Sequence, residues 1–328
     1  MTDTERERPG GDDVLVVGGT GVDTIVRVPG LAVPEGDSLF VPPVRDVAGH
    51  TGTAVALALR ALHRRVRLVD FIGDDPQGAL LRDRFAAAGV TVDALPAPAG
   101  TPRGVNLVDA AGRRFSFFDG RHPPDLLMPP GAVLPHAARA RHVHLTRSPM
   151  NRDLLPALAG RGVPLSTDLH DWDGDDERAH PWAFHPDLVF LSTAALGGRT
   201  GDVMRAVLRR GRARQVVAMD GAHGCHVLGR DGAVRSVPAV VPPDPVVDSN
   251  GAGDAFVAAW LHTRLDGGGT DACVRAGLVA GAYACTRHGT AETHLTAAAL
   301  ATAVRALPAE PGAVRRPAPA GRDGWRWS

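Results

Sequence analysis

The sequence contains no lysine, and all 36 of its basic residues are arginine. A Walker-type phosphate loop requires its lysine, so that class of nucleotide-binding protein is excluded. Three cysteines are present; they have no metal-ligand spacing, and their odd number argues against a disulfide framework. Acidic residues also number 36, so no net charge favours nucleic acid or an anionic membrane as a partner.

Long apolar runs are missing as well. No stretch reaches the roughly 18 residues that a membrane span needs. The charged N-terminus lacks the apolar segment of a signal peptide, so we expect a cytoplasmic protein. Residues 1–12 are polar and are expected to be disordered, and residues 309–328 form an expected flexible tail rich in Pro, Gly and Arg. One folded domain is therefore expected over residues 13–308.

Short apolar runs alternate with helical patterns between these ends. Val14–Val17, Val66–Ile72 and Gln215–Met219 predict buried strands, and Thr53–Leu62 and Gly78–Ala88 predict helices. Strands that alternate with crossover helices favour a mainly parallel sheet covered by helices on both faces.

One section departs from this alternation. Gly104–Asp109 and Arg114–Phe118 each alternate apolar and polar residues, which predicts a half-exposed hairpin with which Leu39–Arg45 could pair. A small antiparallel sheet on a parallel core can serve as a lid over a site. The pattern alone fits a plain surface hairpin equally well.

Glycines precede an apolar helix near the C-terminal third of the chain. Gly251-Ala252-Gly253-Asp254 leads into a helix expected at Ala255–Leu261. Such a helix start offers free backbone N–H groups and the positive end of the helix dipole to an anion. Asp254 either caps the helix or acts as a base for an attacking hydroxyl group. Taken alone, these residues favour the cap.

The longer segment Asp248–Phe256, DSNGAGDAF, resembles the C-terminal signature D-T-x-G-A-G-D-x-F of the ribokinase/PfkB family of carbohydrate kinases. Only the threonine position differs, and Ser249 keeps its hydroxyl group. The resemblance implies an α/β fold of the ribokinase-like type: a three-layer α/β/α core with a mainly parallel sheet. It also implies a small antiparallel β lid, formed here from about residues 33–46 and 101–120.

Other segments match the family less completely. Ala48–Leu59 resembles the signature G-G-x-x-x-N-x-A, but Thr53 replaces the asparagine that contacts the sugar. Phe190–Ala195 lacks the glutamate of the family's N-x-x-E, which helps to organise Mg²⁺, so metal ligands are left unassigned. Arg287–Thr290 matches a loop that contributes to a monovalent-cation site in some members. The rival dinucleotide fingerprint G-x-G-x-x-G fails, because Thr24 stands at its third glycine.

The resemblance implies an ATP-dependent kinase that acts on a hydroxyl group of a sugar or nucleoside-like molecule, with ATP and Mg²⁺ and in some members a monovalent cation. A homodimer through the lid is a further expectation from the family, and neither nucleic acid nor a membrane is an expected partner. Because the Thr53 and Phe190–Ala195 segments depart from the family pattern, the alternative is a ribokinase-fold ligand-binding protein with weak or no kinase activity.

The resemblance also assigns roles to single residues. Asp254 becomes the catalytic base, and the backbone of Gly251, Ala252 and Gly253 completes an anion hole. The expected acceptor-binding residues are Asp23, Gly49, Thr53, Asn106 and Asp168. The expected nucleotide-binding residues are Ser192, Gly221, Gly224, Asp248 and Asn250.

Overall fold

A computed structural model describes residues 11–32, 35–110, 112–230, 232–289 and 291–308. The expected flexible tail and most of the expected disordered N-terminus lie outside these ranges. Gly11 and Asp12 are described, and the Asp12 carboxylate accepts a hydrogen bond from Arg67 at 2.8 Å. Asp12, which was expected to be disordered, is therefore tied to the sheet through Arg67.

The larger sheet has nine strands among the described residues. Parallel pairing joins seven of them, and the last two add to one edge in antiparallel fashion. This confirms the predicted mainly parallel core. The strand order is β13 (Arg235–Val237), β12 (Cys225–Gly229), β11 (Gln215–Met219), β10 (Leu188–Ser192), β9 (Leu165–Asp168), β8 (His142–Leu145), β1 (Val14–Val17), β4 (Val66–Ile72) and β5 (Thr91–Pro96).

Helices cover both faces of this sheet, as alternating side chains of β1 require. Val14 and Val16 pack into the core cluster that contains α1 (Thr51–Ala61), α2 (Pro76–Ala88), α7 (Ala252–Leu265) and α8 (Thr270–Ala284). Leu15 and Val17 face the cluster of α3 (Pro130–Ala137), α4 (Leu154–Ala159), α5 (His180–Phe184) and α6 (Thr200–Arg210). The remaining helix, α9 (Ala297–Ala306), packs against α8. The core is therefore the expected three-layer α/β/α arrangement.

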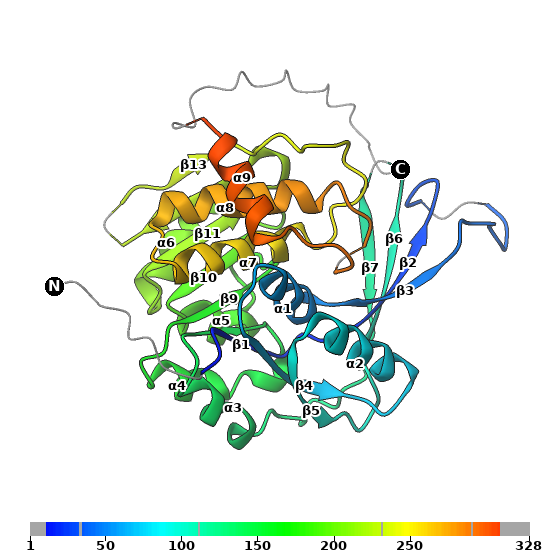
Figure 1. Ribbon diagram of the computed structural model, residues 1–328, viewed down its shortest axis with the longest axis horizontal. Helices are drawn as coiled ribbons and strands as arrows, with labels where there is room; N and C mark the ends of the chain where they lie inside the picture. The colour runs from blue at the N-terminus through cyan, green and yellow to red at the C-terminus, as the bar shows by residue number, and fades with distance from the viewer. Residues whose placement is uncertain (1–10, 33–34, 111, 231, 290, 309–328) are drawn as a thin grey trace.

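A four-stranded sheet stands beside this core, in the order β3 (Arg45–Gly49), β2 (Gly21–Arg27), β6 (Arg103–Val108) and β7 (Arg114–Phe118) (Figure 1). The predicted hairpin is present as β6 and β7. The suggested pairing of Leu39–Arg45 with that hairpin is wrong, because β3 pairs with β2 instead. The central pair, β2 with β6, is parallel, so only the outer two pairings of this lid are antiparallel.

The turn between β1 and β2 connects the core to the lid. Its backbone is held by a buried carboxylate, since Asp70 accepts hydrogen bonds from Thr20 N at 2.7 Å and Thr20 Oγ1 at 2.6 Å. The carbonyl of Gly19 in the same turn accepts from Gly52 N and Thr53 N at the start of α1. The lid strand β2 and the start of α1 are thereby fixed together.

No helix among the described residues is long and apolar enough to span a bilayer.

Candidate active site

The start of α7 presents backbone donors to an open space. Gly251 is the N-cap residue with φ 72°, a left-handed conformation that glycine adopts without steric cost. Within the described part of the chain, no protein group accepts from the N–H of Gly253 or Asp254, whereas Ala255 N donates to Gly251 O at 2.9 Å. The helix starts at Ala252, three residues before the expected start, so these two free donors belong to its first turn.

Asp254 lies in this first turn and does not cap it. Gly251 holds the N-cap position, and no side chain caps the helix by a hydrogen bond. The Asp254 carboxyl group therefore does not have the structural role of a helix cap. The helix dipole and the free N–H groups at this end favour negative charge.

The Asp254 carboxyl group is strongly perturbed. Desolvation by the surrounding protein raises its pKa to about 8, and the nearby carboxylates of Asp168 and Asp23 add to the rise while Arg114 opposes it. These neighbours come from the end of β9, from β2 and from β7. The shift therefore shows that core and lid bring their charged groups to one site around Asp254.

Asp23 is buried in the lid, where glycines make room for its carboxylate. A Cβ atom at Gly49 would stand 2.2 Å from Asp23 Oδ2, and one at Gly104 would stand 2.7 Å from Asp23 Oδ1. Both positions therefore exclude larger residues unless Asp23 moves. The structure therefore brings the predicted residues Asp23 and Gly49 together. Glycine is needed at position 49 because a side chain there would collide with the Asp23 carboxylate.

His50 next to Gly49 takes an unusual backbone conformation, with φ 66° and ψ 157°. This region is costly for a residue with a Cβ and is seen where surrounding structure enforces it. The ring lies 3.7 Å from Asp23 by its Nε2 atom and packs edge-on against Phe118, with ring centroids 5.8 Å apart. Burial lowers the pKa of the His50 imidazole, although the Asp23 and Asp119 carboxylates counteract this. His50 thus places a polar ring beside Asp23, and the sequence did not single it out.

Asp168 ends β9 and is bound by the following turn. Its Oδ1 atom accepts from His170 N at 2.8 Å, and His170 Nδ1 lies 3.7 Å from its Oδ2 atom. The same imidazole reaches Thr51 Oγ1 at 3.4 Å through Nε2. The Asp168–His170–Thr51 chain links the C-terminal end of β9 to the first turn of α1.

Two further predicted acceptor-binding residues are buried. Thr53 is fully buried in α1, and its Oγ1 atom has no partner among the described residues. Asn106 is 2% exposed, and its Oδ1 atom accepts from Ser116 Oγ at 2.5 Å across the β6–β7 pair. The hydrogen bond of Asn106 joins β6 to β7, and contact of either residue with an acceptor stays a prediction.

The predicted nucleotide loop follows β11. Gly221 has φ 52° and open space around its missing side chain, so a ligand can approach its backbone. Gly224 has φ 109°, and a Cβ there would stand 2.0 Å from Val237 O, so this glycine is required by the turn into β12. Ser192 at the end of β10 accepts from Ala194 N at 3.2 Å through Oγ. The three residues lie at the carboxyl ends of neighbouring strands, where ligands bind in open α/β sheets.

Asp248 and Asn250 lie under the start of α7. Asp248 is fully buried, and its carboxylate accepts from Asn250 N at 3.0 Å and Gly289 N at 3.3 Å. Asn250 is 2% exposed, and its Nδ2 atom has no partner among the described residues. The Asp248 side chain therefore orders the loop before α7, and its expected contact with nucleotide stays a prediction.

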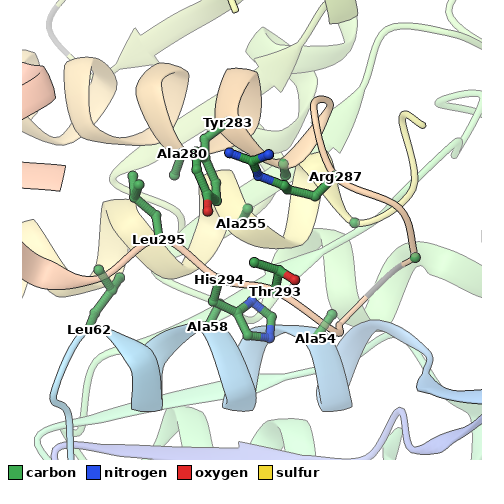
Figure 2. A pocket seen from close by; sticks show the side chains of 13 residues that line it. Ala54, Ala58, Leu62, Ala255, Ala280, Tyr283, Arg287, Thr293, His294 and Leu295 are labelled. Atoms are coloured by element: carbon green, nitrogen blue, oxygen red, sulfur yellow. The ribbon is translucent and has the colours of Figure 1, made fainter. Parts of the chain in front are cut away.

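A pocket lies beside this loop, lined by several alanines and by the larger side chains of Tyr283, Arg287 and His294 (Figure 2). It is a narrow space of about 20 Å³, partly open to solvent, between α1, α7, α8, Gly289 and residues 293–295. Arg287 stacks over Tyr283 at 4.9 Å on one wall. Gly251, at the start of α7, and Ala280, Tyr283 and Ala284, near the end of α8, line the pocket. Gly221 and Gly224 do not line it.

The described residues contain no group of three or more His, Cys, Asp or Glu side chains that could hold a metal ion. At the position of the family's metal-organising glutamate stands Ala195, which is exposed. The residues present therefore do not fit a protein-held Mg²⁺ site. Mg²⁺ in kinases is also carried by nucleotide phosphates with few protein ligands.

Comparisons with known proteins identify the family of this chain. The family model described as pfkB family carbohydrate kinase matches residues 182–297. An acarbose 7(IV)-phosphotransferase from Actinoplanes sp. is 48% identical over 290 residues, covering 88% of this chain and 97% of the relative. An ATP-dependent ribose-1-phosphate kinase from Halopiger xanaduensis is 28% identical, over 84% of this chain and 93% of the relative.

Solved structures show the same relationship. A microbiome-derived acarbose kinase superimposes with a TM-score of 0.84 at 43% identity, over 90% of this chain and 99% of that one. An Arabidopsis thaliana ribokinase complexed with ribose and ATP has a TM-score of 0.75 at 19% identity, over the same 90% of this chain and 99% of its own, a likeness of fold. The protein therefore belongs to the pfkB family of carbohydrate kinases, phosphotransferases whose acceptor is an alcohol group.

Proposed function

We propose that this protein transfers the γ-phosphoryl group of ATP to a hydroxyl group of acarbose or a closely similar pseudo-oligosaccharide. The observation that carries the reaction is Asp254, a non-capping carboxyl group beside the free N–H donors of the α7 start. The acceptor class rests on the two acarbose-phosphorylating relatives, at 48% and 43% identity.

The reaction assigns Asp254 the role of general base. One carboxylate oxygen of Asp254 takes the proton of the acceptor hydroxyl group. At the same time the hydroxyl oxygen of the acceptor forms a bond to the γ-phosphorus. The bond between the γ-phosphorus and the bridging oxygen breaks, and ADP leaves with that electron pair. A base works best when its pKa is near the working pH, and the pKa of Asp254 is raised to about 8.

The start of α7 supplies the stabilisation of charge. The N–H groups of Gly253 and Asp254 face no protein acceptor, so they can donate to oxygens of the transferring phosphoryl group. The positive end of the α7 dipole acts in the same direction. Mg²⁺ bound to the nucleotide phosphates would neutralise further charge.

The lid and the end of β9 supply polar groups for acceptor hydroxyls. Asp23 and His50 lie on the lid side, and Asp168 and His170 on the core side. Phe118 is 68% exposed beside them, and a Cβ at Gly104 would stand 3.6 Å from its ring and 2.7 Å from Asp23. An exposed aromatic ring next to hydrogen-bonding carboxylates suits a saccharide ring, which has an apolar face and polar edges.

An acceptor panel tests this proposal. Purified protein with Mg²⁺ and ATP is incubated with acarbose, maltose-type oligosaccharides, ribose, fructose and nucleosides, and ADP release is measured. We expect acarbose to give the highest kcat/KM. Turnover of ribose or a nucleoside with no turnover of acarbose would contradict the acceptor class. Absence of ADP release with every acceptor, from protein that binds nucleotide, would favour the weakly catalytic alternative.

A further inference from the structure

Asp248 is a buried carboxylate that needs positive charge. It has no exposed surface, and a buried carboxylate without compensation is costly. Two backbone donors, from Asn250 and Gly289, reach it, and they supply partial charge only. A third donor is required to neutralise it.

The third donor is Arg27, the last residue of lid strand β2. Its Nη2 atom lies 3.2 Å from Asp248 Oδ2, and its Nη1 atom donates to Val247 O at 3.3 Å. Nη2 also lies 2.7 Å from His288 Nδ1. A guanidinium group only donates, so His288 Nδ1 is the acceptor of this hydrogen bond. Arg27 thus joins residues 220 or more positions away into one cluster.

A second lid contact reaches the same loop. Ser249 Oγ lies 3.4 Å from the carbonyl oxygen of Gly112 in the β6–β7 turn. A Cβ atom at Gly112 would be 3.7 Å from Val247, which places the two backbones in close contact. The loop that precedes the anion hole is therefore touched by the lid at Arg27 and at Gly112.

We infer that Arg27 is a positioning residue that acts as a built-in cation: it neutralises Asp248, ties the lid to the loop before α7, and removes the need for a monovalent cation at this place. The inference rests on the proposed kinase function of the same site. Asp248 can position the anion hole because it accepts a hydrogen bond from the backbone N–H of Asn250. Asn250 directly precedes Gly251, the first residue of the anion hole.

This arrangement does not fit a monovalent cation at Asp248. Both carboxylate oxygens already accept from protein donors, and the guanidinium group occupies the side of Oδ2 that faces Val247 O. A cation there would stand beside the positive charge of Arg27. The expectation of a monovalent cation, drawn from the 287–290 loop, therefore conflicts with the side chain that this chain supplies.

Nucleotide binding without acceptor tests the inference. The Kd of a nonhydrolysable ATP analogue with Mg²⁺ is measured by calorimetry in potassium chloride and in choline chloride at equal ionic strength. We expect the wild-type Kd values to agree within about twofold, since the built-in cation is always present. A tightening of about tenfold or more in potassium chloride would overturn the inference. No acceptor is needed, so failure of the proposed acceptor class does not affect this result.

Arg27→Met is expected to weaken nucleotide binding in choline chloride by about tenfold, because the unpaired Asp248 carboxylate disturbs the anion hole. Potassium chloride should restore part of this loss, which a merely structural defect would not show. Arg67→Met is the matched control: Arg67 is also half-buried with ion pairs, to Asp12 and Asp93, and its removal should leave the Kd unchanged. The inference would be overturned if Arg27→Met bound the nucleotide with wild-type affinity. It would also be overturned if the affinity of Arg27→Met were the same in potassium chloride and in choline chloride.

A double variant covers the case in which Arg27→Met does not fold. Arg27→Met/Asp248→Asn removes the unpaired charge, so we expect a cooperative melting curve by circular dichroism. Its nucleotide affinity should be weak and the same in both salts, because no carboxylate remains to attract potassium. Wild-type affinity in this variant would show that the Arg27–Asp248 pair does not position the anion hole.

Discussion

Asp254, Asp168 and Asp23 are separated by up to 231 positions in sequence and yet influence one another's charge. The desolvation of Asp254 and the two neighbouring carboxylates act in the same direction, and Arg114 offsets only part of their effect. The base is therefore prepared by its surroundings for proton uptake near neutral pH. A solvent-exposed aspartate would be too weak a base for this role.

The raised pKa of Asp254 predicts the pH dependence of the reaction. The base acts in its deprotonated form, so kcat/KM should rise with pH on the acid side of about 8 and level off above that value. Asp168→Asn removes a negative neighbour, so the inflection should move to lower pH, by on the order of one unit. The measurement is kcat/KM across pH for both proteins.

Asp93→Asn is the control for this profile, since Asp93 pairs with Arg67 and His136 on the edge strand β5. Its inflection should match that of the wild type. An Asp168→Asn profile with the wild-type inflection would mean that Asp168 does not share the charge environment of Asp254.

The site residues that stand in local sequence motifs could be predicted from the sequence. Asp254 and Gly251 stand in one continuous signature, and Asp23 and Asp168 were assigned through the resemblance to the family. His50 was missed, although it lies between Gly49 and the start of α1 in the degraded family motif. Arg27 gave no signal at all, because its partner Asp248 is 221 positions away and the pairing depends on how the lid meets the core.

At the scale of elements, the apolar runs predicted the positions of the buried strands correctly. Val14–Val17, Val66–Ile72 and Gln215–Met219 have the predicted bounds. Edge strand β5 was missed because it is half exposed and ends in a proline, and α3 was missed because it contains Pro135. A proline inside a helix contradicts the usual helix pattern.

The junction of β3 with α1 offers a prediction about this part of the lid. Gly49→Ala places a Cβ atom 2.2 Å from Asp23 Oδ2, so the carboxylate must move away. We expect KM for the acceptor to rise about tenfold or more, because a shift of about 1 Å at a reacting geometry is costly. KM for ATP should stay unchanged, because Asp23 lies on the acceptor side. Steady-state kinetics with each substrate varied in turn separates the two.

Gly131→Ala is the control for this change. Gly131 lies in α3, and nothing lies within 4 Å of the Cβ atom that the substitution would add. Both KM values should match the wild type. An equal rise of both KM values in Gly49→Ala would point to general damage and contradict the local role of Gly49.

At the scale of the whole molecule, the long signature and the alternation of strands and helices were enough to predict a three-layer core with a lid. The pairing of β2 with β6 could not be predicted, because it joins strands from distant parts of the chain in parallel. The outer face of the lid carries exposed Phe115 and Phe117, which lie 5.1 Å apart. A homodimer through this face stays a prediction.

Core and lid together make the site, since Asp254 and Asp168 come from the core and Asp23 and Arg114 from the lid. We propose that Asp254 removes the proton of an acceptor hydroxyl during phosphoryl transfer. Its substitution by asparagine keeps the size of the side chain and the α7 start, and removes only the base.

The most direct test is the mass of the product formed by wild-type protein and by Asp254→Asn, each incubated with ATP, Mg²⁺ and acarbose. The account predicts that the wild type yields acarbose carrying one phosphate group. Asp254→Asn should bind the ATP analogue with unchanged Kd and form this product about 10²–10⁴ times more slowly, the usual contribution of a general base. Phosphorylation by Asp254→Asn at the wild-type rate would contradict the role of Asp254 as the general base.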